Sequence, residues 1–181
     1  MPYGQQYAPV RPGSRRLGQR PPSTFPPDRA MPNALLPAAR WVCEHMAPSP
    51  LDAGLASRAA RDFTGQLLRR WDLLALAEDA AVIVSELVTN ALRHGLRDLG
   101  GAGAAQVELI WWLRAGEITC MVTDPGAEAP VMVPPDPLAE AGRGLHVVEA
   151  LSDAWGWTRL EDCRKAVWAT LPVPAGCGRP A

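Results

Sequence analysis

The stretch from Ala80 to Gly95 constrains the fold of this chain most. Its apolar residues recur every three or four positions, the spacing that buries one broad face of an α-helix: Ile83, Val84, Leu87, Val88, Ala91 and Leu92. Glu86, Asn90 and His94 follow at intervals of four, so they line one side of the same helix. Asparagine is a poor helix former, and its place beside a carboxylate has two explanations, an exposed helix edge or a polar site. Both stay open at this point.

The composition predicts one domain with a sizeable core and excludes several classes of protein. The chain has 181 residues, of which 48% are hydrophobic. Its formal net charge of −1 gives no electrostatic footprint for nucleic acid or an anionic membrane. No apolar run approaches the roughly 18 residues that cross a bilayer, and no apolar signal core begins the chain. The four cysteines show no metal-ligand spacing, so we expect a cytoplasmic protein.

The first 33 residues have the composition of a disordered leader. Eleven of the 19 prolines lie in the first 50 residues, where they prevent a continuous helix or an inner strand. Five arginines make the leader basic: Arg11, Arg15, Arg16, Arg20 and Arg29. A leader without a specific role is favoured over a weak docking arm. We therefore expect a Pro/Arg-rich leader over residues 1–33, one domain over 34–173 and a flexible end over 174–181.

Alternating periodicities predict the order of elements within the domain. A strand over Arg40–Met46 precedes a helix over Leu55–Trp71, which Asp52 is expected to cap. The helix that carries Glu86 begins near two acids, Glu78 and Asp79, which suit a helix N-terminus.

Two further hairpins and a third helix follow along the chain. Gln106–Arg114 and Glu117–Thr123 form a hairpin across the link Ala115-Gly116, with Ile118, Cys120 and Val122 facing a core. The third helix covers HVVEALSDAW, and the last two strands cover Trp155–Leu160 and Ala166–Leu171. This order predicts an α/β fold of the two-layer α+β type, with a mixed, mostly antiparallel sheet and the helices on one face.

Three separated features of the sequence could share one site. Glu86 and Asn90, one helical turn apart, can hold Mg²⁺ and orient a water or hydroxyl. Asp124 leaves a buried strand, is followed two positions later by Gly126, and can accept a hydrogen bond from a ligand amino group. The Gly142-x-Gly144 motif opens a helix, whose free N–H groups suit a phosphate. Each feature alone is more often a turn or a cap. Their combination favours a ligand site.

These motifs resemble the conserved boxes of a known superfamily. ELVTNA (Glu86 to Ala91), DPG (Asp124 to Gly126) and GRGL (Gly142 to Leu145) look like the N, G1 and G2 boxes of the GHKL ATP-binding fold. The resemblance extends from about Arg40 to Leu171. It is strongest to the stand-alone anti-sigma-factor serine kinases, because the chain shows no pattern for a dimerisation helix pair, a sensor or a transducer region.

The resemblance implies a GHKL (Bergerat-type) fold that binds ATP and Mg²⁺ between the N-box helix and the sheet. Asn90 would ligate the Mg²⁺, and Glu86 would be the general base for a serine hydroxyl. Asp124 would hydrogen-bond the adenine amino group, and Gly126 would allow its close approach. Four residues would lie beside the phosphates, with the arginine as a charge stabiliser: Gly142, Arg143, Gly144 and Leu145. Phosphoryl transfer asks mainly for such positioning and charge neutralisation.

Two functions remain open on this resemblance. One is a protein serine/threonine kinase that binds a sigma factor and phosphorylates a serine of its antagonist, with homodimers an expectation from the same branch. The other is an inactive partner-switch module with weak or no nucleotide turnover. Three departures favour the second: Ala127 and Glu128 follow the DPG motif, the segment Pro130–Pro137 lacks Gly and Phe, and Arg164-Lys165-Ala166 replaces a usual Gly-Thr pair.

Overall fold

The computed structural model describes residues 38–45, 50–95, 105–114, 116–126, 128–132, 142–160, 164–174 and 177. The predicted leader, residues 1–33, lies outside these ranges, as does most of the predicted C-terminal end. Ala127 and most of the Pro130–Pro137 segment also fall outside them, so the expectations about these residues stay predictions.

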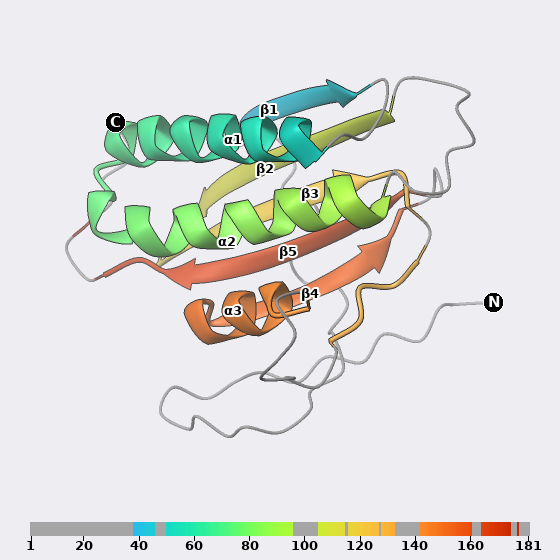
Figure 1. Ribbon diagram of the computed structural model, residues 1–181. Helices are drawn as coiled ribbons and strands as arrows, with labels where there is room; N and C mark the ends of the chain where they lie inside the picture. The colour runs from blue at the N-terminus through green and yellow to red at the C-terminus, as the bar shows by residue number, and fades with distance from the viewer. Residues whose placement is uncertain are drawn as a thin grey trace.

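Five strands form one sheet in the order β1-β2-β3-β5-β4 (Figure 1). Their bounds are Ala38–His45 (β1), Ala105–Arg114 (β2), Glu117–Asp124 (β3), Ala154–Arg159 (β4) and Lys165–Pro172 (β5). All four pairings between neighbouring strands are antiparallel. The sheet is therefore fully antiparallel, whereas the sequence predicts a mixed, mostly antiparallel sheet. The hairpin across residues 115 and 116 is confirmed, because Arg114 pairs with Glu117.

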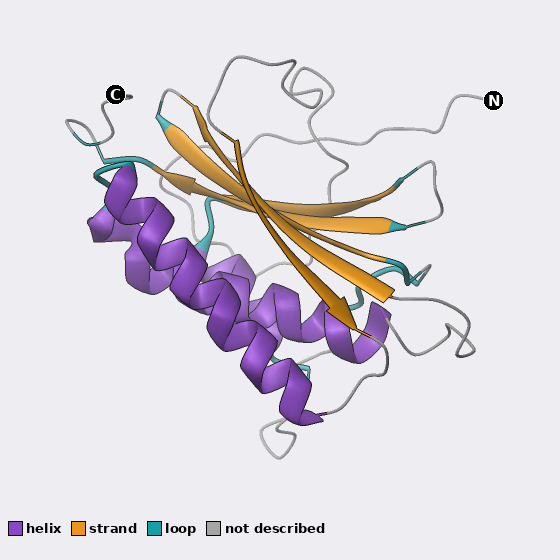
Figure 2. Cartoon of the chain, turned by 90° about the horizontal axis from the view of Figure 1, so that it is seen from above, coloured by secondary structure: helices purple, strands orange, loops and turns teal. Residues whose placement is uncertain are grey.

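Three α-helices cover one face of this sheet (Figure 2). They are α1 (Pro50–Arg70), α2 (Ala77–Asn90) and α3 (Gly144–Leu151), with a short 3₁₀ turn, η2 (Leu74–Leu76), before α2 and a π-helical turn, η3 (Ala91–Gly95), after it. The predicted two-layer arrangement is therefore confirmed. Among the described residues, no helix combines the length and apolar character needed to cross a membrane.

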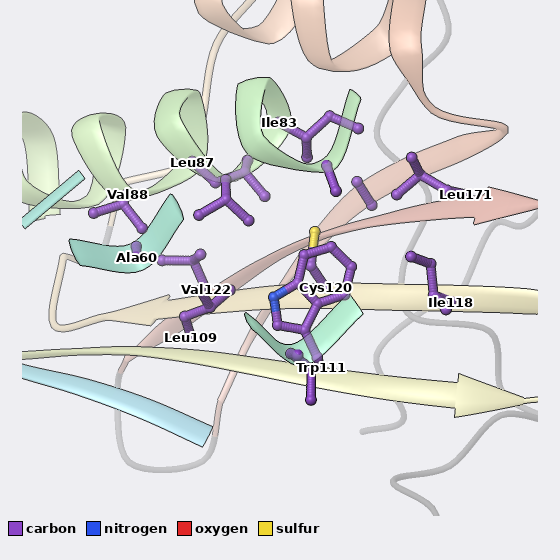
Figure 3. Close-up of a cluster of buried hydrophobic side chains, with 14 of the residues drawn as sticks. Ala60, Ile83, Leu87, Val88, Leu109, Trp111, Ile118, Cys120, Val122 and Leu171 are labelled. Atoms are coloured by element: carbon purple, nitrogen blue, oxygen red, sulfur yellow. The ribbon is translucent and has the colours of Figure 1, made fainter. Parts of the chain in front are cut away.

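The main core lies between α2 and the centre of the sheet (Figure 3). The apolar positions of α2 are buried as its periodicity predicts: Ala80, Ile83, Val84, Leu87 and Val88. They meet inward side chains of β2, β3 and β5, among them Trp111, Ile118, Cys120, Val122 and Leu171. Complete burial raises the pKa of the Cys120 thiol to about 12, so it packs as a small neutral hydrophobe.

Two polar contacts fix the helices against each other and against the sheet. Arg61 Nη1 of α1 donates to Ser85 Oγ of α2 at 2.9 Å. Trp111 Nε1 of β2 donates to Thr64 Oγ1 of α1 at 3.2 Å in the core. A buried donor that finds an acceptor avoids the cost of desolvation, so these contacts help set the position of α2 over the sheet.

Two helix boundaries differ from the sequence-based expectations. Helix α1 begins at Pro50, five residues before the predicted start, because proline is tolerated in a first helical turn. Asp52 therefore lies inside the helix, and its prediction as the cap is wrong. Helix α3 ends at Leu151 rather than at Trp155, since Ser152 is extended and its Oγ bonds Val148 O at 2.7 Å.

Candidate functional site

The first cluster of candidate residues lies where α3 begins against α2. Glu86 and Asn90 are half-buried on α2, one turn apart. A Cβ added at Gly144, the first residue of α3, would lie 2.5 Å from Glu86 Oε2 and 3.3 Å from Asn90 Nδ2. The absence of a side chain at residue 144 therefore lets the α3 backbone approach both polar groups. A carboxylate, an amide and a helix N-terminus meet here.

The other residues of the GRGL motif lead the chain into α3. Gly142 is exposed and has φ of 91°, a left-handed conformation that glycine adopts without strain. Arg143 is exposed at the N-cap position, and its carbonyl accepts the Val147 N–H at 3.1 Å. Leu145 is buried, so its side chain anchors the helix. The motif thus combines one turn residue, one exposed cation and one apolar anchor.

The second cluster is built on a buried ion pair between two strands. The register of β3 and β5 places Asp124 opposite Lys165. Lys165 Nζ lies 2.7 Å from Asp124 Oδ1, and the two side chains are only 6% and 1% exposed. The Gly126 N–H also donates to Oδ1, at 2.9 Å. Lys165 is the only lysine in the chain, and all the other residues counted as Lys or Arg are arginines.

The π-helical turn η3 connects the two clusters. It begins directly after Asn90 and ends at Gly95, which lies against Asp124. A Cβ at Gly95 would lie 2.5 Å from Asp124 Cγ, so this position has no space for a side chain. The wider π turn also interrupts the α-helical spacing after Asn90, and His94 does not continue the ladder of Glu86 and Asn90. π-helical turns inside longer helices often mark functional sites.

The electrostatics of the second cluster depend on Lys165. Burial raises the pKa of Asp124, because removal from water disfavours the charged carboxylate. The hydrogen bond and positive charge of Lys165 act in the opposite direction, as does the Gly126 N–H. The ammonium group is therefore the main partner that favours the ionised form of Asp124.

The residues present fit the groups that the motifs imply. Mg²⁺ is usually held in proteins by one or two oxygen ligands together with phosphates and water, and the Asn90 side chain offers such an oxygen beside the Glu86 carboxylate. In the described ranges, no group of three His, Cys, Asp or Glu side chains could hold a metal ion. A nucleobase amino group would find an acceptor at Asp124.

Comparison with known families decides the classification. The profile of the histidine kinase-like ATPase domain matches residues 50–171, more than half of the chain. The chain belongs to the histidine kinase-like ATPase family. A search of the curated proteins found no relative that matches it. Family membership confirms the GHKL resemblance and marks the domain as an ATP-binding type, whereas the anti-sigma-factor branch goes beyond it.

The fold brings most of the predicted site residues of this histidine kinase-like ATPase into two groups. Glu86, Asn90 and Gly144 form one group, and Asp124 and Gly126 belong to the other. Sequence reasoning missed two residues of the second group, Gly95 and Lys165. Both left a signal in the sequence: the glycine follows the ELVTNA helix, and the lysine is unique and begins an apolar strand.

We expect Gly95→Ala to destabilise the protein by about 1–3 kcal/mol, the usual cost of overpacking a filled interior. The added Cβ must displace the Asp124 side chain, which the ion pair with Lys165 holds in place. Urea denaturation of the wild type and the variant measures the difference.

Gly65→Ala is the matched control for this substitution. Gly65 lies within α1, and a Cβ added there meets no atom within 4 Å. Alanine in a helix interior is favoured over glycine by up to about 1 kcal/mol, so this variant should be at least as stable as the wild type. Equal stability of the two variants would contradict the close packing of Gly95 on Asp124.

Proposed function

We propose that this histidine kinase-like ATPase is a protein serine/threonine kinase that binds a sigma factor and phosphorylates a serine of its antagonist. The observation that carries the proposal is the contact of Gly144 with Glu86 and Asn90 at the start of α3. This contact brings a carboxylate, an amide and a helix N-terminus to one place, and groups of this kind have the chemistry that phosphoryl transfer needs.

Each residue has a role in the proposed reaction. Bound ATP would supply the transferable phosphoryl group, and Mg²⁺ would neutralise charge on its phosphates. Asn90 would hold the metal through its amide oxygen, and the N–H groups at the start of α3 would bind phosphate. Arg143, exposed beside them, adds positive charge. Glu86 would accept the proton of the serine hydroxyl that the protein partner presents. The serine oxygen would bond the γ-phosphorus of ATP, and the bond from that phosphorus to the β-phosphate oxygen would break to release ADP.

A specific observation favours a second function, an inactive partner-switch module. The Asp124 carboxylate, the expected acceptor for the nucleobase, already holds a buried ion pair with Lys165. If that pair excludes the base, the domain binds proteins without nucleotide. Calorimetry with ATP separates the two functions.

We expect the wild type to bind ATP more tightly with Mg²⁺ than without it. Asn90→Ala should weaken ATP binding about tenfold or more in the presence of Mg²⁺, because substitutions of groups that hydrogen-bond metal ligands typically have effects of this size. In the absence of Mg²⁺ the substitution should have little effect. Isothermal titration calorimetry of both proteins under both conditions measures these affinities.

Thr89→Ala is a suitable control, because Thr89 neighbours Asn90 on α2 but is not a predicted ligand. No binding by the wild type at millimolar ATP would sink the kinase proposal and favour the partner-switch module. Equal Mg²⁺ dependence of wild type and Asn90→Ala would instead remove Asn90 from the metal site.

A further inference from the structure

Among the residues that the structure describes, the ion pair of Asp124 and Lys165 leaves one hydrogen-bond donor and one acceptor without a partner. An ammonium group carries three N–H donors. Lys165 Nζ donates to Asp124 Oδ1 at 2.7 Å and to Gly126 O at 3.5 Å. Within the part of the chain that the structure describes, Lys165 has no third acceptor, and no hydrogen bond reaches Asp124 Oδ2. A donor and an acceptor therefore stand side by side.

The remaining donor and acceptor positions belong to side chains that are nearly buried. Asp124 and Lys165 are 1% and 6% exposed, so little water reaches either group. Among the described residues, Asp124 Oδ2 is not one of the fully buried side-chain atoms that lack a hydrogen-bond partner. Oδ1 already receives two donors, Lys165 Nζ and the Gly126 N–H, so a ligand donor must bond Oδ2. A ligand that offers one donor next to one acceptor would match the remaining positions of the pair.

We propose that Lys165 is a specificity-determining residue, which reads the edge of the nucleobase next to the position that the family resemblance assigns to Asp124. This assignment rests on the proposed nucleotide site. Asp124 Oδ2 accepts a hydrogen bond from the 6-amino group of adenine, and Lys165 Nζ donates to the neighbouring ring nitrogen, N1. Guanine reverses this pattern of donor and acceptor, since it carries a carbonyl at position 6 and an N–H at position 1. It would place an acceptor on Asp124 and a donor on Lys165.

The choice of lysine agrees with this role. The only lysine of the chain occupies this position, although every other position with a lysine or an arginine carries arginine. An ammonium is a compact charge with three rotatable donors, whereas a guanidinium is a broad planar fork. A compact group can bond a carboxylate and still donate to a single ring nitrogen beside it.

Analogues of ATP test the proposal by changing one ring atom at a time. 1-Deaza-ATP replaces N1 by C–H and keeps the 6-amino group, whereas 7-deaza-ATP changes the far side of the purine. Calorimetry with the full chain should show 1-deaza-ATP binding at least about tenfold more weakly than ATP, the range for a hydrogen bond to a charged group. 7-Deaza-ATP should bind within about twofold of ATP. GTP should bind more weakly than any of them.

Substitutions of Lys165 test whether this residue causes the difference in affinity between ATP and 1-deaza-ATP. In Lys165→Met, ATP and 1-deaza-ATP should bind equally, since neither meets a donor at N1. Lys165→Gln keeps a neutral N–H donor and should retain part of the difference, which covers the case in which the methionine variant does not fold. The ratio of two affinities within one protein is insensitive to a uniform loss of active molecules.

Three results would overturn the assignment, and they differ from one another. Equal binding of ATP and 1-deaza-ATP by the wild type would remove Lys165 from base recognition and leave the proposed function intact. Tighter ATP binding by Lys165→Met than by the wild type would show that the lysine obstructs the base. No ATP binding by the wild type would overturn the proposed function, and this assignment with it.

Discussion

Lys165→Met is expected to lower the free energy of unfolding by about 3–5 kcal/mol at neutral pH, the usual cost of removing one partner from a buried ion pair. The substitution leaves the Asp124 carboxylate 1% exposed and without the ammonium that bonds Oδ1. A folded domain of this size has only about 5–15 kcal/mol of stability in total, so the loss is large.

The stability lost in Lys165→Met should depend on pH, and the direction of this dependence follows from the pKa of Asp124. Burial already raises the pKa of Asp124, and removal of Lys165 takes away the main opposing influence, so the pKa rises further. The folded variant then holds a proton that the unfolded chain has released above the ordinary pKa of about 4. Its stability relative to the wild type therefore falls as the pH rises and recovers as the pH is lowered towards that value.

Urea denaturation at pH 5 and pH 7 measures the effect through the denaturation midpoint. The double variant Asp124→Leu/Lys165→Met is the control, because replacing both members of a buried pair with apolar residues often costs little. It should regain most of the lost stability and lose the pH dependence. An unchanged midpoint for Lys165→Met at pH 7 would mean that the ion pair contributes nothing in solution.

Glu86→Gln is expected to slow phosphoryl transfer about 10²- to 10⁴-fold, the range for removing a positioned general base. The amide keeps the size of the carboxylate beside Gly144 but cannot accept the serine proton. Because Glu86 acts on the serine hydroxyl in this mechanism, ATP affinity should change only a few-fold. Labelled ATP and candidate antagonist proteins provide the assay, with calorimetry for ATP binding.

Glu78→Gln is the matched control for the loss of a negative charge on the same helix. Glu78 is exposed in the first turn of α2, eight residues before Glu86, and its substitution should leave the transfer rate unchanged. A Glu86→Gln protein that transfers phosphate at the wild-type rate would disprove the assignment of the base. Equal losses in both variants would instead point to a general electrostatic effect.

The sequence predicts those parts of the fold that depend on local pattern. The period of Ile83, Val84, Leu87 and Val88 identifies the buried face of α2, and the link Ala115-Gly116 identifies the first hairpin. Boundaries are less predictable because neighbouring signals compete. Asp52 has the chemistry of a cap, yet Pro50 fits the first turn and starts the helix earlier.

The site is predicted only in part because its contacts join distant segments. Glu86 and Asn90 share a helix, and their spacing alone places them together. The pairing of Asp124 with Lys165 depends on the register between β3 and β5, which no local pattern of either strand specifies. The contact of Gly95 with Asp124 further requires the π turn that follows Asn90.

The single lysine has a practical consequence for chemical labelling. Reagents that modify amines have only two targets in this chain, the N-terminal amine and the Lys165 side chain. Because Lys165 is 6% exposed, its reductive methylation needs a local opening of the β3–β5 end of the sheet. The wild-type protein thus carries its own reporter, and isotope-labelled methyl groups on Lys165 would make that opening visible by NMR without any substitution.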